Sequence, residues 1–349
     1  MIESQKSRLQ RPWLWLPSQL AHDLSPFVLP LLSCVQTSFN KKWKPRQWRG
    51  LQFSNPLGIA GGVDKNGYCL TAWSRLGCGF LEVGTVTPEP QGPNPGTIMA
   101  RDFSYQALWN KMGFPNSGMS ALAKVLQAKK SKLPLPLFVN VGKNRWTDNK
   151  SAFKDYSHCV QGLAAFADAF VINLSSPNTE GLRDLLSESE LLAFLSSLRN
   201  ECHGKDEKKP FLLKLSPDMD EQTLLMVFEI SKPFVEGWIL TNTTKSRADG
   251  LKFPKESGGV SGQPLKELSI QSLRLAAPIK KRNPEKLLVS VGGVATAQDV
   301  CERLELGADL VQVYSSLVFG GPFYFKRIIK DLQLLESQSA SVHDSPEVL

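Results

Sequence analysis

The sequence predicts an α/β fold, a (β/α)8 TIM barrel with a short amino-terminal helical hairpin. From residue 51 onward, eight short apolar runs follow one another, each ends in glycine or small polar residues, and each precedes a stretch of helical character. The runs span residues 57–62, 80–86, 137–142, 170–176, 211–216, 238–244, 287–293 and 310–316. Apolar strands that alternate with helices indicate a parallel sheet covered by helices, and eight such units are typical of a closed barrel.

A doubly wound open sheet is the alternative fold for alternating strands and helices. Many such sheets carry a G-x-G-x-x-G motif after a strand, and none of the eight runs is followed by it. We therefore prefer the barrel.

The composition indicates one large domain with an appendage. The 349 residues are 42% hydrophobic and 21% charged, which is typical of a globular protein. We divide the chain into an amino-terminal segment (1–50), a barrel (51–336) and a tail (337–349), which lacks apolar periodicity and should be disordered. The cysteines form no C-x-x-C pair and the histidines have no metal-ligand spacing, which indicates a reducing compartment and no metal site.

Most of the net charge of +8 belongs to the amino-terminal segment, where eight Lys and Arg residues stand against two acids. The same segment holds Trp13, Trp15, Trp43 and Trp48, which are four of the eight tryptophans. Indole rings and basic side chains suit the headgroup level of an anionic bilayer, so we predict peripheral attachment to a membrane surface. No window reaches the roughly 18 apolar residues of a spanning helix.

Two short amphipathic helices are predicted in this segment. Leu20, Leu24, Phe27, Val28, Leu31 and Val35 recur at helical spacing. Ser25 and Pro26 are suitable as an N-cap and a first helical position, so a helix is predicted to begin there. The alternative is a helical hairpin that packs only on its own domain.

Polar or glycine residues end every apolar run, and a barrel gathers such residues at one mouth. They are Gly61–Gly62, Thr85, Asn140, Asn173 with Ser176, Lys214, Thr241–Thr243, Gly292–Gly293 and Tyr314–Ser315. Lys214 interrupts an apolar run, and a buried ammonium needs a partner charge on a ligand or on a neighbouring carboxylate. Gly292–Gly293 follow the seventh run, where barrels commonly bind phosphate, although a plain tight turn would also explain them.

This pattern favours a barrel that binds a phosphate-bearing flavin. Asparagines offer donors and acceptors, so a cluster of them suits a flat polar ring such as a pyrimidine. A lysine at a strand end suits the edge of a flavin that becomes anionic on reduction. The residues by themselves thus lead to a flavin oxidoreductase, but to no particular substrate.

Ten blocks of sequence occur in a distinctive order. They are NPLGIAGGVDKNG (55–67), EVGTVTPEPQ (82–91), WNKMGFPN (109–116), VNVGKN (139–144), INLSSPNTEGLR (172–183), LLKLSPDM (212–219), TNTT (241–244), GGVSGQPL (258–265), SVGGV (290–294) and LVQVYSSLVFGGP (310–322). Together they resemble class 2 dihydroorotate dehydrogenase, the membrane-associated, quinone-reducing enzyme of pyrimidine synthesis, over residues 13–335. The resemblance implies bound FMN, oxidation of (S)-dihydroorotate to orotate, and reoxidation of the flavin by ubiquinone or menaquinone.

The resemblance also implies roles for individual residues. Ser176 matches the base that removes the C5 proton while the C6 hydride passes to the flavin, and Thr179 matches a threonine that helps to carry the proton away. Serine at this position indicates class 2, since class 1 enzymes carry cysteine there. The matched substrate-binding residues are Lys65, Asn110, Asn173, Asn178, Asn242 and Thr243. The matched FMN-binding residues are Ala60, Gly61, Thr85, Asn140, Asn173, Lys214, Thr241, Ser261, Gly262, Gly293, Tyr314 and Ser315.

In the family, the amino-terminal helices form an apolar tunnel that leads quinone from the bilayer to the flavin, and Arg101 matches an arginine of this tunnel. A peripheral position on the cytoplasmic face of a bacterial inner membrane is therefore expected, with no nucleic acid and no obligatory protein partner. The sequence departs from the family pattern at Glu89, Ile98, Pro115 and Ser316. These departures leave the preferred quinone and the sensitivity to inhibitors open.

Two other functions compete with this interpretation. A flavin barrel that reduces uridines in tRNA also needs a pyrimidine pocket, but it predicts basic residues around the barrel mouth rather than in the amino-terminal segment. A membrane-surface binding protein built on an inactive barrel need not retain Lys65, Ser176 and Lys214, all of which are present.

Overall fold

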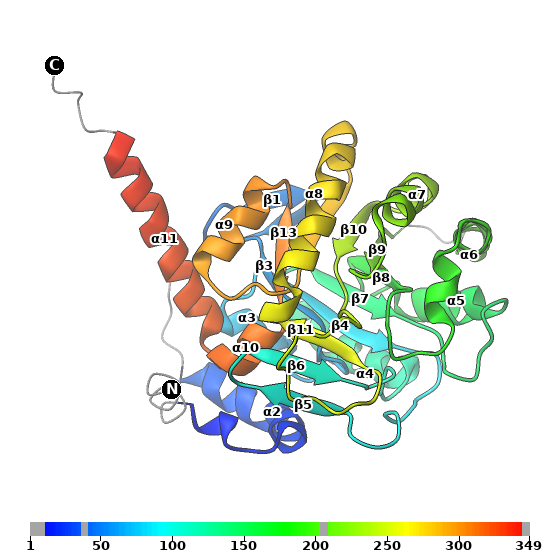
Figure 1. Ribbon diagram of the computed structural model, residues 1–349, viewed down its shortest axis with the longest axis horizontal. Helices are drawn as coiled ribbons and strands as arrows, with labels where there is room; N and C mark the ends of the chain where they lie inside the picture. Colours follow the sequence, from blue (N-terminus) through cyan, green and yellow to red (C-terminus); the bar gives the residue numbers. More distant parts are fainter. Residues whose placement is uncertain (1–10, 36–40, 203–208, 344–349) are drawn as a thin grey trace.

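Eight parallel strands close into a barrel in the computed structural model, which describes residues 11–35, 41–202 and 209–343 (Figure 1). The strand order is β10-β12-β13-β3-β4-β7-β8-β9. The strands are β3 (Leu57–Asp64), β4 (Phe80–Val86), β7 (Leu137–Val141), β8 (Ala169–Asn173), β9 (Phe211–Leu215), β10 (Gly237–Leu240), β12 (Leu287–Val291) and β13 (Leu310–Val313). Each predicted run overlaps one strand, so the predicted (β/α)8 barrel is confirmed.

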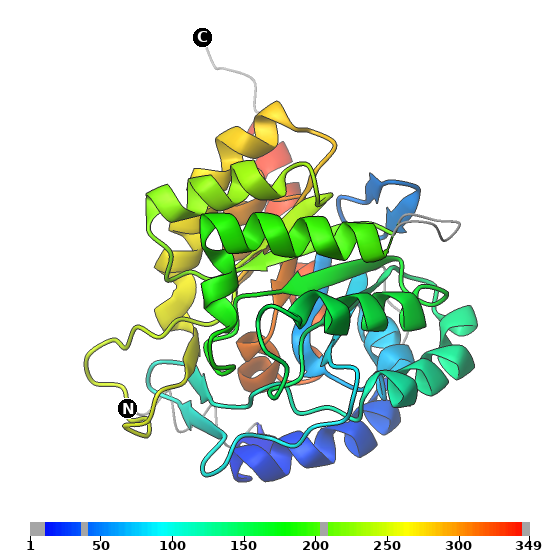
Figure 2. The same cartoon turned by 90° about the vertical axis from the view of Figure 1, so that its right-hand side faces the viewer.

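Helices cover the outside of the barrel (Figures 1 and 2). They are α3 (Leu70–Leu76), α4 (Met119–Lys129), α5 (Ala152–Leu163), α6 (Glu188–Glu201), α7 (Glu221–Ser231), α8 (Lys266–Arg282), α9 (Ala297–Glu305), α10 (Ser315–Gly320) and α11 (Tyr324–His343). Short 3-10 helices are η2 (Lys130–Lys132), η3 (Leu182–Leu186) and η4 (Gln263–Leu265).

The carboxyl-terminal helix is longer than predicted. α11 continues to His343, so the predicted disorder from residue 337 is wrong for residues 337–343. The buried face of α11, which includes Phe325 and Leu332, packs the first part of the helix against the core, and extending a formed helix is far easier than starting one. Residues 344–349 of the predicted tail lie outside the described residues.

Inward-facing side chains change from apolar to polar along the barrel strands. Alternate residues of a strand point to the same side, so Phe80 and Glu82 of β4 both face inward, as do Leu212 and Lys214 of β9. Phe80 and Leu212 belong to the apolar cluster in the barrel interior. Glu82 and Lys214, two residues further along, are also buried, at 0% and 5% exposure. Ionisable groups therefore occur only toward the carboxyl ends of these two strands.

A β-hairpin closes the amino end of the barrel. β1 (Arg46–Trp48) pairs antiparallel with β2 (Leu51–Phe53). The ring of Phe53 packs edge-on against Phe80 and Phe138, with centroids 5.8 and 6.3 Å away. Residues 46–50, which the sequence analysis assigned to the amino-terminal segment, thus belong to the barrel.

Two of the four tryptophans predicted to face a membrane are buried in the protein instead. Trp43 is 4% exposed within the main core, and Trp48 is 9% exposed and donates a hydrogen bond of 3.0 Å to the Glu285 carbonyl. Trp13 is half-buried, whereas Trp15 is 64% exposed. The prediction is wrong for Trp43 and Trp48 because both belong to clusters of residues far along the chain, which local charge patterns do not reveal.

The described amino-terminal part contains the 3-10 helix η1 (Pro12–Leu14) and one α-helix, α2 (Ser18–Cys34), instead of two α-helices. Both Pro26 and Pro30 lie inside α2. The predicted helix start at Ser25–Pro26 is therefore wrong.

Side chains compensate for the prolines inside α2. Pro26 lacks the N–H group that would bond to the His22 carbonyl, and the Ser25 hydroxyl donates to that carbonyl at 2.8 Å. Pro30 leaves the Pro26 carbonyl free in the same way, and the Cys69 thiol donates to it at 3.8 Å. Because both carbonyls have other partners, the helix continues through the two prolines.

The outer face of α2 is apolar and exposed. Its side chains include Leu20, Phe27 and Leu31, of which Phe27 and Leu31 are each 72% exposed. None of the helices in the described ranges has both the length and the mean hydropathy needed to cross a bilayer.

A small antiparallel sheet that the sequence did not predict lies between α2 and the barrel (Figure 1). Its strand order is β11-β6-β5, with β5 (Met99–Asp102), β6 (Ala107–Asn110) and β11 (Gly259–Gly262). Each strand has four residues, and β11 comes from a loop far along the chain from β6. The barrel strands β10 and β13 are equally short but lie in longer apolar runs, which β5, β6 and β11 lack, so only their pairing reveals these three strands.

Candidate active site

A pocket at the carboxyl ends of the barrel strands brings together nearly all predicted site residues. It is lined by Ala60, Gly61, Lys65, Thr85, Asn110, Asn140, Asn173, Ser176, Asn178, Lys214, Thr241, Asn242, Thr243, Ser261, Gly262, Gly293, Tyr314 and Ser315, among others. Thr179 and Arg101 do not line it. Residues from all eight strand ends therefore meet in one cavity, which we call the main pocket.

A fully buried carboxylate, Glu82, lies at the base of the main pocket. Its Oε1 atom is 3.0 Å from the Lys214 ammonium and accepts a hydrogen bond of 2.6 Å from Asn140. Its Oε2 atom accepts a hydrogen bond of 2.6 Å from Gln312. Lys214 thus has the carboxylate partner that the sequence analysis left as an alternative, and it lines the pocket as well.

Sequence reasoning missed Glu82 and Gln312. Both are polar residues inside apolar runs, which is the signal that singled out Lys214. Gln312 lines the main pocket, and its Oε1 atom is buried without a donor among the residues that the structure describes. A buried acceptor of this kind suits an N–H group of a ligand.

Amide and hydroxyl side chains form a connected network on one side of the main pocket. Asn173 donates to Thr85 at 3.0 Å and to Asn140 at 3.2 Å, and Thr85 donates to Asn140 at 2.7 Å. Asn242 donates to Asn173 at 3.3 Å. These contacts fix the side chains in place and leave the pocket with both donors and acceptors.

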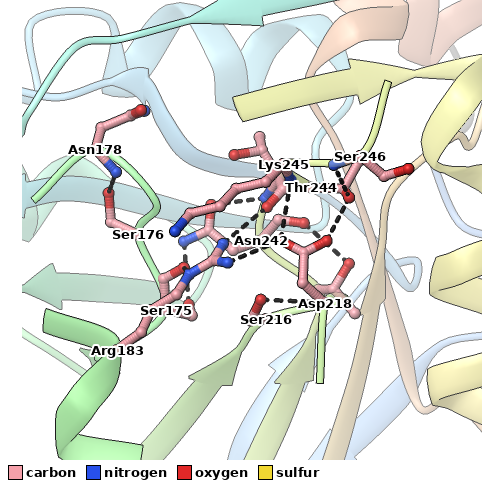
Figure 3. Close-up of polar contacts among 12 residues, drawn as sticks. Ser175, Ser176, Asn178, Arg183, Ser216, Asp218, Asn242, Thr244, Lys245 and Ser246 are labelled. Atoms are coloured by element: carbon pink, nitrogen blue, oxygen red, sulfur yellow. Dashed lines mark hydrogen bonds and ion pairs between the residues drawn. The ribbon is translucent and has the colours of Figure 1, made fainter. Parts of the chain in front are cut away.

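Ser176 lies in the turn after β8, and its side chain is almost completely buried. Its hydroxyl oxygen accepts a hydrogen bond of 3.2 Å from the Asn178 N–H, as Figure 3 shows. The Asn178 amide in turn donates to Asn110 at 2.8 Å. The Thr179 hydroxyl is buried without a partner in the described part of the chain, so no direct hydrogen bond joins it to Ser176.

Lys65 is the cation on the α2 side of the main pocket. Its ammonium donates to the Gly62 carbonyl at 3.0 Å and lies 3.4 Å from the His22 ring of α2. Burial lowers the pKa of Lys65 to about 8, although the neighbouring Asp64 acts in the opposite direction. Burial and then the charge of Lys65 lower the pKa of His22 to about 4, so His22 is neutral at pH 7.

The turn after β12 has a backbone that only glycine can adopt. Gly292 and Gly293 have φ values of 121° and 69°, and a Cβ atom on Gly293 would lie 2.5 Å from the Lys266 Cα atom. The fully buried Arg303, which sequence reasoning also missed, donates to the Gly292 carbonyl at 2.6 Å. The Gly292 carbonyl and the Gly293 N–H belong to one trans peptide bond and point in opposite directions. The Gly293 N–H therefore points away from Arg303.

A second, mostly apolar pocket lies between α2 and the barrel, and we call it the α2 slot. It is lined by Trp13, Leu16, Ala21, His22, Leu24, Val28, Leu32, Val63, Trp73, Met99, Arg101, Tyr314, Leu317 and Pro322, among others. Arg101 donates to the Ser18 hydroxyl at 3.1 Å and to the Leu16 carbonyl. Met99 and Tyr314 also line the main pocket, so the two pockets adjoin there.

The four departures from the family pattern lie at different places. Pro115 and Ser316 line the main pocket, and the Ser316 hydroxyl donates to the Val294 carbonyl. Glu89 and Ile98 line neither the main pocket nor the α2 slot.

Potential metal ligands are dispersed. In residues 11–35, 41–202 and 209–343, no group of three or more His, Cys, Asp or Glu side chains is arranged to hold a metal ion. The six cysteines are all free thiols.

Comparison with known proteins identifies relatives of the whole barrel. Residues 46–335 match the protein family described as dihydroorotate dehydrogenase. The dihydroorotate dehydrogenase (quinone) of Thermus thermophilus is 45% identical over 298 residues, which cover 84% of this chain and 83% of the relative. That of Dichelobacter nodosus is 40% identical over 329 residues, which cover 92% and 95%. Among solved structures, DHODH from Eimeria tenella in complex with ferulenol has a TM-score of 0.84 and 29% identity, with 92% of each chain covered.

Proposed function

This chain belongs to the dihydroorotate dehydrogenase family, and from that membership we propose how its residues oxidise dihydroorotate to orotate with a quinone as electron acceptor. The family consists of flavin-dependent oxidoreductases of pyrimidine biosynthesis. The observation that carries the proposal is that Ser176, Lys214 and the asparagines line one pocket although they come from separate parts of the sequence.

FMN is the flavin that we propose for the main pocket, and several features fit it. The glycine turn at Gly292–Gly293 and the hydroxyls of Ser261 and Ser315, which are 2.9 Å apart, suit a phosphate group. The buried Gln312 acceptor suits the N–H edge of the flavin ring. When bound, FMN accepts the hydride that leaves the substrate.

Ser176 is the proposed base that removes the C5 proton of dihydroorotate. A serine hydroxyl is a weak base, so the proton needs a route out of the pocket. The buried, unpartnered Thr179 hydroxyl supports a relay in which one ordered water bridges the two side chains.

Lys65 and the asparagines are proposed to hold the substrate. The Lys65 ammonium suits the substrate carboxylate, and Asn110, Asn173, Asn178 and Asn242 suit the amide edges of the pyrimidine ring, with Thr243 beside them. The hydrogen bonds among these amides orient them before substrate binds, which lowers the entropy lost on binding.

Lys214 is proposed to place positive charge against the flavin ring as the ring gains electrons. Its ion pair with Glu82 holds the ammonium in position at the base of the pocket. The remaining predicted FMN residues are proposed to contact the cofactor from the strand ends that they occupy.

The α2 slot is proposed as the quinone tunnel. Its apolar lining suits an isoprenoid quinone, and Arg101 and His22 supply polar groups within it. The exposed apolar face of α2 supports peripheral attachment to a membrane, from which a quinone would enter. Residues 11–35 of the predicted amino-terminal segment then carry the tunnel and the membrane contact, while residues 46–50 belong to the barrel.

The test is turnover of dihydroorotate with four acceptors, ubiquinone, menaquinone, fumarate and NAD, measured side by side on the purified, flavin-loaded protein. We expect at least one quinone to support turnover well above fumarate and NAD. Faster turnover with fumarate or NAD than with either quinone would contradict the proposed acceptor. Release of a flavin other than FMN on denaturation would contradict the proposed cofactor.

A further inference from the structure

An ion pair behind the substrate side of the main pocket connects three strand ends. Arg183, in η3 after β8, lies 2.8 Å from Asp218, which follows β9 (Figure 3). The two side chains are 19% and 20% exposed. Neither residue lines the main pocket, so neither is placed to touch the substrate. We call this pair the Arg183–Asp218 clasp.

Arg183 uses three separate nitrogen atoms on three separate segments. Nη1 pairs with Asp218, Nε donates to the Ser175 carbonyl at 3.0 Å, and Nη2 donates to the Thr243 carbonyl at 3.2 Å. Ser175 follows β8, Asp218 follows β9 and Thr243 follows β10. The planar guanidinium fixes the angles between these contacts, which the single ammonium of a lysine does not reproduce.

Asp218 completes the connection from the other side. Its Oδ1 atom accepts a hydrogen bond from the Thr244 hydroxyl, and Oδ2 accepts one of 2.9 Å from the Lys245 N–H. Its own N–H donates to the Ser216 hydroxyl at 3.1 Å. The carboxylate thus holds the first residues of the loop after β10 against the end of β9.

The groups held by the clasp are direct neighbours of the reacting groups. Ser175 precedes Ser176, and its hydroxyl accepts a hydrogen bond of 3.0 Å from Asn242. Thr243 follows Asn242 and lines the pocket itself. A shift of the clasp would therefore displace the base and the substrate-binding amides together, and misplacement by about 1 Å can slow an enzyme about 10²-fold.

We propose that Arg183 and Asp218 are positioning residues for dihydroorotate oxidation, which hold the Ser176 hydroxyl at the distance from the substrate that proton removal requires. This inference rests on the proposed role of Ser176 as the base.

The chain offers a matched control at the opposite ends of the same strands. Arg199 of α6 pairs with Glu236 at 2.6 Å, with 15% and 25% exposure, and also donates to the Phe234 carbonyl at 2.6 Å. Glu236 accepts from the N–H of Phe211, the first residue of β9. The Arg199–Glu236 pair therefore resembles the clasp in chemistry and burial, but it lies at the amino ends of β9 and β10.

The experiment compares Arg183→Lys with Arg199→Lys in the flavin-loaded, full-length protein. Rapid mixing with saturating dihydroorotate gives the rate constant for bleaching of the bound flavin. We expect Arg183→Lys to lower this rate constant about tenfold or more, and Arg199→Lys to keep it within about twofold. Equal rate constants in the two variants would overturn the inference.

A deuterium isotope effect separates positioning from a general loss of stability. With C5-deuterated dihydroorotate, we expect a larger isotope effect on flavin bleaching in Arg183→Lys than in the unmodified protein, because removal of the C5 proton becomes slower relative to hydride transfer. Arg199→Lys should leave the isotope effect unchanged. An isotope effect that is also unchanged in Arg183→Lys would overturn the inference.

Combination with Ser176→Ala distinguishes this inference from the proposed function. If the clasp acts through Ser176, adding Arg183→Lys to Ser176→Ala should change the rate constant by less than about twofold, because coupled residues are not additive. An unchanged rate constant in Ser176→Ala would contradict both the role of Ser176 as the base and the positioning role of the clasp. A lowered rate constant in Ser176→Ala together with an unchanged one in Arg183→Lys would contradict only the positioning role of the clasp.

Thr244→Val provides a second variant in case Arg183→Lys folds poorly. It removes the hydroxyl that donates to Asp218 and accepts a hydrogen bond of 2.9 Å from the Ser246 N–H, and it leaves both charges of the clasp in place. We expect a rate constant lowered about three- to tenfold, a smaller change than in Arg183→Lys, because Asp218 loses one hydrogen bond but keeps its ion pair with Arg183. The C5 isotope effect should rise as well, and an unchanged isotope effect in Thr244→Val would overturn the inference.

Discussion

The two ends of the barrel interior carry side chains of opposite character. At the amino end of the barrel interior, the rings of Phe53, Phe80 and Phe138 pack together in an apolar cluster. At the carboxyl end, Glu82 and Lys214 form a buried ion pair at the base of the main pocket. Only two positions of β4 separate Phe80 from Glu82. The residues expected to stabilise the barrel and those expected to take part in the reaction thus lie at different heights of the same strands. Substitutions should therefore change the stability and the reaction rate separately.

The largest effect is expected at the carboxyl end, from Ser176→Ala. Removal of the proposed base should slow flavin bleaching by dihydroorotate about 10²–10⁴-fold at neutral pH, while bound flavin and the unfolding temperature change little. Stopped-flow absorbance measures the rate. Ser157→Ala in α5 is the matched control, since both serines are 5% exposed. A Ser176→Ala protein as fast as this control would refute the assignment.

The next largest effect is expected at the amino end, from Phe138→Ala. Loss of this ring should lower the free energy of unfolding by about 3–5 kcal/mol, measured by urea denaturation. The rate constant for flavin bleaching, expressed per bound flavin, should stay within about twofold. Phe138→Leu serves as the milder variant if Phe138→Ala does not fold. A large fall in the rate constant would show that the two ends are not independent.

A smaller effect is expected from the exposed face of α2. Phe27→Ser combined with Leu31→Ser should weaken binding to anionic vesicles about tenfold or more, because less apolar surface enters the bilayer. Turnover with a long-chain quinone in vesicles should fall in parallel, and turnover with a soluble dye should not. Leu192→Ser, at an exposed leucine of α6, is the control. Deletion of residues 1–50 would be a poorer test because it removes β1 from the barrel floor.

The smallest expected effect concerns pH. Only the charged form of Lys65 attracts the orotate carboxylate, and its pKa is lowered to about 8, so affinity should fall as the pH rises through this value. The charged fraction predicts an orotate Kd about fourfold weaker at pH 8.5 than at pH 7. Lys65→Arg, whose guanidinium stays charged, should show no such weakening. A Kd that is constant over this range in the unmodified protein would contradict the assignment of Lys65.

The sequence predicts the barrel well because its signal is local. Each apolar run is long enough to indicate a strand, and the polar residues after the runs indicate the mouth. Lys214 stands out for the same reason, as a cation inside such a run. The local signal also predicted that the strand-end residues would converge, whereas others, such as Lys65, Asn110 and Asn178, were predicted only from the family resemblance. All of the predicted substrate and cofactor residues line the main pocket.

Features that depend on distant partners could not be predicted in this way. Glu82 forms an ion pair with Lys214, which is 132 positions away in the sequence. Arg183 likewise contacts Asp218 and Thr243, which come from other strand ends. Trp48 is buried because it packs against the barrel and donates a hydrogen bond to the Glu285 carbonyl, far along the chain. α2 is one helix because the Ser25 and Cys69 side chains satisfy carbonyls that two prolines free.

Met99 and Tyr314 line both the main pocket and the α2 slot, and this arrangement of two adjoining pockets has a kinetic consequence. Under the proposed function, a water-soluble donor and a lipid-soluble acceptor bind in different pockets and need not be present at the same moment. Double-reciprocal plots at several fixed acceptor concentrations should then give parallel lines, and excess orotate should compete with dihydroorotate without competing with the quinone.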